Sequence, residues 1–176
     1  MSFECFFGGE AAEKTLKEII LGWVLIYCYQ EESMNQNSEV NKAMVRRFVE
    51  DVKNKRHLEQ LGDIFQADYQ EHNPTVSSFG PGIEGYRNFL GHLFSAFPED
   101  AVTIDEIVAE GDMVSYRGTE SGTHRAEFLR IPATGKSATW TEIQFFRFRD
   151  GKVVEHWVDV DLFSWFTQLG VIPPMG

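Results

Sequence analysis

The sequence predicts a single α+β domain in which three helices pack on one curved antiparallel sheet. Apolar residues recur at helical spacing between Val40 and Phe97, and after Pro98 they recur at every second position, as in strands. Asp150-Gly151 then separates two alternating segments, which is a strong hairpin signal. Helices first and long antiparallel strands afterwards are typical of an α+β fold.

Each predicted helix has one apolar stripe, and each break between helices has a Pro, Gly or Asn signal. In chain order we predict a helix over 40–52 capped by Ser38, a short helix over 58–65, an extended segment over 68–72, a loop over 76–82 and a helix over 83–97.

The predicted sheet occupies residues 101–160. Its strands begin at Val102, run over 113–119, continue over 122–131, and finish with the hairpin of 137–149 and 153–160. A terminal helix over 162–169 is predicted, with Asp161 as its N-cap and Gly170 at its end.

Residues 1–36 precede the predicted domain, which we assign to residues 37–176. The apolar run from Ile19 to Tyr29 is too short to span a bilayer as a helix, and its acidic flanks do not fit a secretory signal. We expect residues 1–36 to be an appended segment with few contacts to the domain, with Met34 as an alternative translation start. The other interpretation is a helix that packs on the domain or on a partner.

Composition excludes several classes of protein. The formal net charge of −11 argues against nucleic-acid binding, which requires a basic face, and against binding to an anionic membrane. Cys5 and Cys28 are the two cysteines, so no disulfide framework is indicated and a cytoplasmic location is predicted. Aromatic residues make up 14% of the chain and must fill a core or an apolar cavity.

The final hairpin carries the candidate chemistry. Glu142 and Gln144 share one face of the strand over 137–149 with Trp140, and His156 lies on the next strand. If these faces point into an apolar cavity, a carboxylate and an imidazole there can act as general acid or base. The alternative is a Glu142–His156 pair that only satisfies itself across the hairpin.

Further residues are predicted to bind a ligand. His72 and Asn73 could stand at the mouth of the pocket, or Asn73 could simply bond the backbone of a turn. The aromatic residues Tyr86, Phe89 and Phe97 of the third helix are expected to wall the pocket.

No cofactor or metal is predicted. No two of the five histidines have chelate spacing, and the sequence has no phosphate loop, dinucleotide fingerprint or nucleophile elbow. His92 is interpreted as a satisfied core histidine, and His124 is placed in a strand.

Four segments of the chain, taken in order, carry a family resemblance: Asp68-Tyr69 with His72-Asn73-Pro74, GTHRAEFLRIPATGK over 122–136, DGKVVEHW over 150–157, and QLG over 168–170. They resemble the motifs of SnoaL-like ester and polyketide cyclases. The resemblance implies the cone-shaped α+β barrel of the nuclear-transport-factor-2-like superfamily, often a homodimer through the outer face of the sheet. It also implies a cofactor-free reaction.

One departure from the family pattern affects the chemistry. In those cyclases an aspartate two residues after the hairpin histidine acts as acid and base, and here that position is Val158. Asp159 could replace the aspartate if a bulge turned it inward. Otherwise His156 or Glu142 would be the base.

Three functions are therefore open at this stage. The first is a cofactor-free enzyme that abstracts a proton next to the carbonyl or ester of a hydrophobic or aromatic compound. The second is a non-catalytic protein that binds a small hydrophobic ligand. The third is a dimeric interaction module with a vestigial cavity.

Overall fold

The computed structural model describes residues 9–173. The chain divides into a first unit that ends at Asn37 and a second unit that begins at Ser38. Helix α1 (Gly9–Arg47) forms the described part of the first unit and continues into the second. Within the first unit, the side chains from Ile19 to Tyr29 are exposed. In the described part of the chain, no helix is long and apolar enough to cross a membrane.

In the second unit, α1 passes without a break into the π-helix η1 (Phe48–Asn54). The prediction that Ser38 caps a new helix is therefore wrong. No proline or glycine precedes Ser38 closely enough to end the helix, so the helical backbone simply continues through it. The shorter elements that follow are η2 (Leu58–Gln60), α2 (Leu61–Ile64), α3 (Pro74–Ser77), α4 (Gly82–Ala96) and α5 (Leu162–Leu169).

Helix α3 lies inside a segment that the sequence predicted to be a loop. The Oδ1 atom of Asn73 accepts hydrogen bonds from the backbone N–H groups of Thr75 and Val76, at 2.9 and 3.2 Å. Pro74 occupies the first helical position, where its missing N–H costs nothing. The Asn73 turn is thus confirmed, and it starts a single helical turn.

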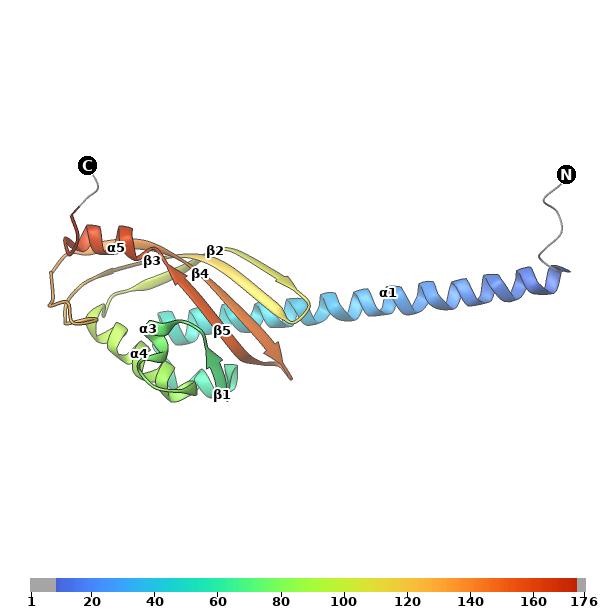
Figure 1. Cartoon of the computed structure of the whole chain (residues 1–176), viewed down its shortest axis with the longest axis horizontal. Coiled ribbons are helices and arrows are strands. Elements are labelled where there is room, and N and C mark those ends of the chain that lie inside the picture. Colours follow the sequence, from blue (N-terminus) through green and yellow to red (C-terminus); the bar gives the residue numbers. More distant parts are fainter. Residues whose placement is uncertain (1–8, 174–176) are drawn as a thin grey trace. The chain divides into compact units, whose positions relative to one another are not determined.

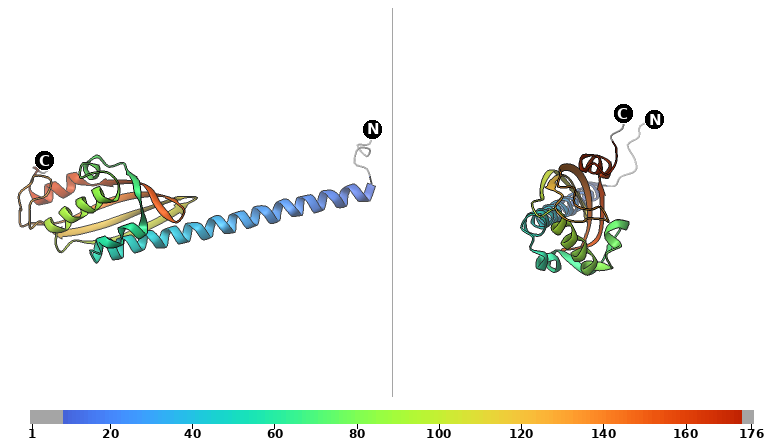
Figure 2. Two further views of the ribbon diagram at one scale, coloured as in Figure 1. Left: turned by 90° about the horizontal axis from the view of Figure 1, so that it is seen from below. Right: turned by 90° about the vertical axis from the view of Figure 1, so that its left-hand side faces the viewer.

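The five strands form one sheet with the order β1-β5-β4-β3-β2. Their bounds are β1 (Phe65–Glu71), β2 (Ala101–Glu110), β3 (Met113–Thr123), β4 (Ser137–Arg149) and β5 (Lys152–Val160). Helix α4 and η1 lie on the concave side of this curved sheet, and α5 packs at one end against β4 (Figures 1 and 2). The predicted α+β class is confirmed.

Strands β2 to β5 are antiparallel, as predicted, but β1 pairs with β5 in parallel. The predicted antiparallel sheet over residues 101–160 is therefore confirmed, and β1 adds a parallel edge strand where only an extended segment was predicted. After β1 the chain crosses the concave face through α3 and α4 and enters the sheet at the opposite edge with β2. The chain then runs from β2 through β3 and β4 to β5, reversing direction each time, so that β5 lies beside β1 and parallel to it.

Two local irregularities were not foreseen. Strand β3 includes the first two residues of the predicted strand over 122–131 and ends at Thr123, and the rest of that segment has a bridge between Phe128 and Ile131. A bulge in the β4–β5 pairing follows Arg147, so that Val153 and His156 both point inward. Strict alternation along β5 would instead put Val154, and not Val153, on the face of His156.

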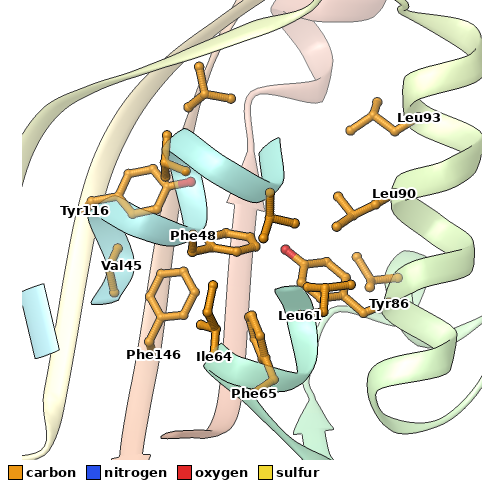
Figure 3. Packing of buried hydrophobic residues seen from close by; sticks show 14 of the residues in the cluster. Val45, Phe48, Leu61, Ile64, Phe65, Tyr86, Leu90, Leu93, Tyr116 and Phe146 are labelled. Carbon is orange, nitrogen blue, oxygen red and sulfur yellow. The ribbon is translucent and has the colours of Figure 1, made fainter. Parts of the chain in front are cut away.

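Aromatic rings dominate the core beneath the sheet. Phe48 of η1 lies between Phe146 of β4 and Tyr86 of α4, with ring centroids 5.7 and 6.0 Å away (Figure 3). Phe65 at the start of β1 contacts the Phe48 ring edge-on at 5.4 Å. These contacts fix the π-helix against both the sheet and α4, and they set the position of the residues that follow Phe48.

Candidate active site

A cavity of about 160 Å³ lies between the sheet, α4 and α5. Its walls are mostly aromatic and aliphatic, with Tyr86, Phe89, Trp140 and Trp165 among them. Its polar lining residues are Lys53, Asn73, Thr75, Glu120, Glu142, Gln144 and Asp159. An apolar pocket with a few convergent polar groups is the usual form of a small-molecule site.

Lys53 is the cation of this site. It follows Val49 and Val52 on the buried side of η1, and its side chain is only 3% exposed. The Nζ atom donates to Oε1 of Glu142 at 2.8 Å and to Oε2 of Glu120 at 3.1 Å. Burial disfavours the charged form, but the two carboxyl groups outweigh it and raise the pKa of Lys53. Lys53 is therefore a buried ammonium.

Glu142 is the carboxylate partner. Burial alone would raise its pKa, but the Lys53 ammonium and the hydrogen bonds from Lys53 and Tyr116 outweigh burial, and the pKa of Glu142 is lowered. The Tyr116 hydroxyl donates to Oε1 of Glu142 at 2.5 Å. Glu142 is thus ionised, and its charge is held in a cavity wall.

Glu120 stands on the other side of Lys53 and behaves differently. Burial is the largest influence on the pKa of Glu120 and raises it, and the nearby carboxyl groups of Glu142 and Asp100 raise it further. Lys53 acts in the opposite direction, but the pKa of Glu120 stays well above its usual range. Its Oε1 atom is buried and has no hydrogen-bond partner among the described residues. The buried Asp100 forms an ion pair with Arg56. Two neighbouring carboxyls, Glu120 and Glu142, therefore have pKa values that are pushed apart, which is a common acid–base arrangement.

The alternative of a Glu142–His156 pair is wrong, because each residue has other partners. His156 is completely buried on the same side of the sheet, but its Nε2 lies 2.9 Å from Oε1 of Gln144 and its Nδ1 lies 2.7 Å from Oε2 of Glu71. In the β4–β5 register, His156 faces Phe146, whereas Glu142 faces Val160. Four residues of strand separate them, so His156 reaches Gln144 instead.

The other predicted ligand-binding residues divide into two groups. Asn73, Tyr86, Phe89, Trp140 and Gln144 line the cavity, and the exposed Asp159 stands at its rim.

His72, Phe97 and His156 do not line the cavity. His72 stacks on Trp157 with ring centroids 4.4 Å apart, and its Nε2 lies 3.0 Å from Glu155 Oε2. Phe97 is buried in an aromatic cluster, 5.3 Å from the Trp165 ring.

Two further histidines differ from expectation. His92 is exposed rather than in the core, because it lies on the opposite side of α4 from the buried Leu90 and Leu93. His124 is buried in the loop after β3 and stacks on Phe97 at 4.9 Å. Among the described residues, no group of three potential ligands could hold a metal ion.

Sequence reasoning missed Lys53 and Glu120, although each carries a signal. Lys53 lies four residues after Val49 and eight after Val45, in the phase of the apolar stripe. Glu120 shares the period-two inner face of β3 with Tyr116. A charged residue at a sequence position that faces the core requires a partner, and Lys53 and Glu120 are partners of each other.

Comparison with known proteins identifies the family. The family model described as SnoaL-like polyketide cyclase matches residues 43–169. The chain belongs to this family. It is 31% identical over 134 residues to the aklanonic acid methyl ester cyclase DnrD of Streptomyces peucetius, which covers 72% of this chain and 88% of that protein.

Solved structures of the SnoaL-like family have the same fold. TsrD from Streptomyces laurentii matches with a TM-score of 0.70 and 29% identity, over 76% of this chain and 97% of that chain. IdmH from Streptomyces antibioticus matches with a TM-score of 0.64 and 31% identity, over 74% and 98%. The nuclear-transport-factor-2-like fold implied by the sequence motifs is thereby confirmed.

Proposed function

We propose that this SnoaL-like chain is a cyclase-type enzyme that carries out cofactor-free acid–base chemistry on a hydrophobic carbonyl or ester compound. The observation that supports this most is the ionised Glu142, which is buried in the wall of an aromatic cavity beside Lys53. A fixed carboxylate next to a fixed ammonium can take a proton from a carbon acid while the ammonium faces the charge that develops.

The acidity of Glu142 limits the compounds on which it could act. A carboxylate with a lowered pKa is a weak base, so its proton donor must be an activated C–H, such as one between two carbonyl groups.

The proposed reaction begins when this C–H bond breaks. Its proton goes to Glu142, and the electron pair becomes that of an enolate. Attack of the enolate carbon on a second carbonyl of the same molecule forms the new C–C bond. The resulting alkoxide then takes the proton back from Glu142.

This assignment moves the acid–base role away from the family position. Val158 occupies that position and contributes an apolar surface to the cavity. Asp159 faces Ile143 in the sheet register and is exposed, so it is the weaker candidate. His156 forms a hydrogen bond with the side-chain amide of Gln144, and its proposed role is to orient that amide toward the cavity.

The function is tested with Glu142→Gln. We would incubate the protein with aklanonic acid methyl ester, on which the relative DnrD is named to act, and with single-ring β-keto esters. Ring closure is followed by mass spectrometry and α-proton exchange in D₂O by NMR. We expect turnover by the wild type and a loss of at least about 100-fold in Glu142→Gln. Unchanged turnover in the variant would contradict the assignment.

A second candidate is a non-catalytic binding protein, favoured by the complete pairing of Glu142 with Lys53 and Tyr116 in an otherwise apolar cavity. In that case the same compounds would bind without ring closure or proton exchange. The predicted cytoplasmic location applies to both candidates.

The homodimer remains a proposal. Phe145 and Ile143 on the outer face of β4 are 43% and 44% exposed, and Val108 is 65% exposed on β2. Arg117 and Asp105 on this face are paired with each other within the chain, and the apolar residues could meet those of a second copy. Sedimentation should show a dimer for the wild type and a monomer for Phe145→Glu. A wild-type monomer at micromolar concentration would contradict this.

A further inference from the structure

The buried ammonium of Lys53 has one donor more than its protein partners use. An ammonium carries three N–H donors. Among the described residues, the hydrogen-bond acceptors of Nζ are Glu142 Oε1 and Glu120 Oε2. The side chain is 3% exposed and lines the cavity, so a partner for the third N–H has to come from the cavity.

The charges around Lys53 allow an oxyanion on the ligand to face it once Glu142 has taken a proton, because the oxyanion then replaces the Glu142 carboxylate as its counter-charge. Two cations, Lys53 and Arg56, face three carboxyl groups, those of Asp100, Glu120 and Glu142. Arg56 is paired with Asp100 and Lys53 with Glu142, and an unbalanced third carboxylate would be costly at this depth. This balance, like the raised pKa of Glu120, favours the protonated form of Glu120, whose Oε2 then accepts from Lys53 and leaves Glu142 as the counter-charge.

We propose that Lys53 binds the oxyanion that forms on the ligand, and that Glu120 is the residue that positions its ammonium. The proposal rests on the proposed function, because the oxyanion is the enolate formed by proton loss. As Glu142 takes the α-proton, the electron pair moves onto the carbonyl oxygen, and the third N–H of Lys53 donates to that oxygen. The protons of Lys53 and Glu120 stay where they are.

The size of the cavity specifies the part of the ligand that enters it. At about 160 Å³ it is close to the roughly 150 Å³ cavity that accommodates benzene in another protein. The expected occupant is a single ring, or one ring of a larger molecule, that carries an enolate or phenolate oxygen.

The test uses 4-nitrophenol, a single-ring probe whose absorbance reports whether its oxygen is ionised. The full-length protein is titrated with the probe across pH, and the apparent pKa of the bound probe is measured. The titratable groups that line the cavity are Lys53, Tyr86, Glu120, Glu142 and Asp159, with Tyr116 bonded to Glu142 and with Asp100 and Arg56 behind Glu120. No turnover is required.

Three variants separate the roles. Lys53→Met with Glu142→Gln removes both charges together, which keeps the buried region neutral so that the protein can fold. In this double variant, the pKa of the bound probe should rise by at least about one unit, a tenfold change in its ionisation. Glu142→Gln alone should lower it by about one unit, because Lys53 then lacks its counter-charge. Glu120→Gln should leave it within about 0.3 units, because a neutral group replaces a neutral group.

Glu110→Gln, an exposed change at the end of β2, is the matched control and should have no effect. The proposal is overturned if the double variant leaves the ionisation of the probe unchanged, or if none of the proteins binds the probe. A large fall in the pKa of the bound probe in Glu120→Gln overturns the positioning role, since it would mean that Glu120 is ionised in the wild type. These outcomes are independent of whether Glu142→Gln abolishes turnover.

Discussion

Lys53 and Glu142 lie 89 residues apart in the chain and meet at 2.8 Å in the core. Lysine and glutamate are rarely this deeply buried unless they are paired, because the loss of hydration exceeds what an imperfect contact returns. The pair is therefore weak evidence for stability and stronger evidence for a working site. Removing Glu142, in contrast, leaves the Lys53 ammonium with Glu120 as its remaining carboxyl partner.

Glu142→Gln is predicted to lower the free energy of unfolding by about 3–5 kcal/mol, the cost of leaving a buried charge unpaired. Urea denaturation at neutral pH measures this. Glu110→Gln at the exposed end of β2 is the control and should change stability by less than about 0.5 kcal/mol. A loss of less than about 1 kcal/mol in Glu142→Gln would show that the Lys53 ammonium is not left unpaired, because Glu120 or water takes the place of Glu142.

Glu120→Gln is predicted to change how stability depends on pH. In the folded protein the pKa of Glu120 lies well above 4.5, whereas the unfolded chain releases this proton near 4.5. Between these two values, the wild type loses up to about 1.4 kcal/mol of unfolding free energy for each unit of rising pH. The variant cannot titrate, so its stability relative to the wild type should rise from pH 5 to pH 8. Parallel stability curves would contradict a protonated Glu120.

The lowered pKa of Glu142 acts in the opposite direction and at lower pH. The stability it contributes is present above its unfolded pKa and is lost as pH falls through its folded pKa. Since Glu142 is present in both proteins, this contribution cancels in the comparison.

Much of the site could be predicted from strand alternation, and some of it could not. Alternation correctly placed Trp140, Glu142 and Gln144 on one buried face. It could not identify the partner of Glu142, because Lys53 comes from a helix that packs over the sheet. The pairing depends on how η1 crosses the strands, and no local pattern encodes that crossing.

At the scale of elements, η1 is what brings Lys53 to the cavity. π-Helices are rare and often occur at functional sites. Here the seven residues Phe48–Asn54 follow α1 directly and pack on β2. Asn54 ends the segment with two hydrogen bonds to Val102: its Nδ2 donates to the carbonyl oxygen at 3.0 Å, and its Oδ1 accepts from the backbone N–H at 2.8 Å.

Asn54→Ala is predicted to lower the free energy of unfolding by about 1–3 kcal/mol, because both backbone groups of the buried Val102 lose their partner. Thermal and urea unfolding measure the loss. Asn88→Ala on the exposed side of α4 is a matched control and should change stability by less than about 0.5 kcal/mol. Equal effects of the two substitutions would mean that Asn54 does not anchor η1.

Among the elements, the long periodic ones were predictable and the irregular ones were not. The helix over 83–97 and the hairpin at Asp150-Gly151 have strong local signals and are present. The bulge after Arg147 and the parallel pairing of β1 depend on contacts with distant strands. A bulge shifts alternation by one position, which is why Val153 is buried on the same side as His156.

At the scale of the whole molecule, the buried apolar residues in the part of the chain whose side chains are described all follow Ser38, and the earliest is Val45. A shortened chain that begins at Met34 is therefore predicted to keep its melting temperature within about 3 °C, equivalent to roughly 1 kcal/mol for a domain of this size. Calorimetry of the two chains side by side measures this. A fall of about 10 °C or more would show that residues before Met34 stabilise the fold.

The parallel edge also has a consequence for the order of folding. β1 starts at Phe65, yet its partner residues begin at Val153, and the backbone N–H of His72 donates to the carbonyl oxygen of His156. At a synthesis rate of roughly 5–20 residues per second, about 4–18 s separate the two strands as they emerge. During that time β1 has no neighbouring strand, and the hairpins of β2 to β5 can close first because their contacts are local. We therefore expect docking of β1 to be a late step, and the exposed edge of β5 to be the place where nascent chains aggregate.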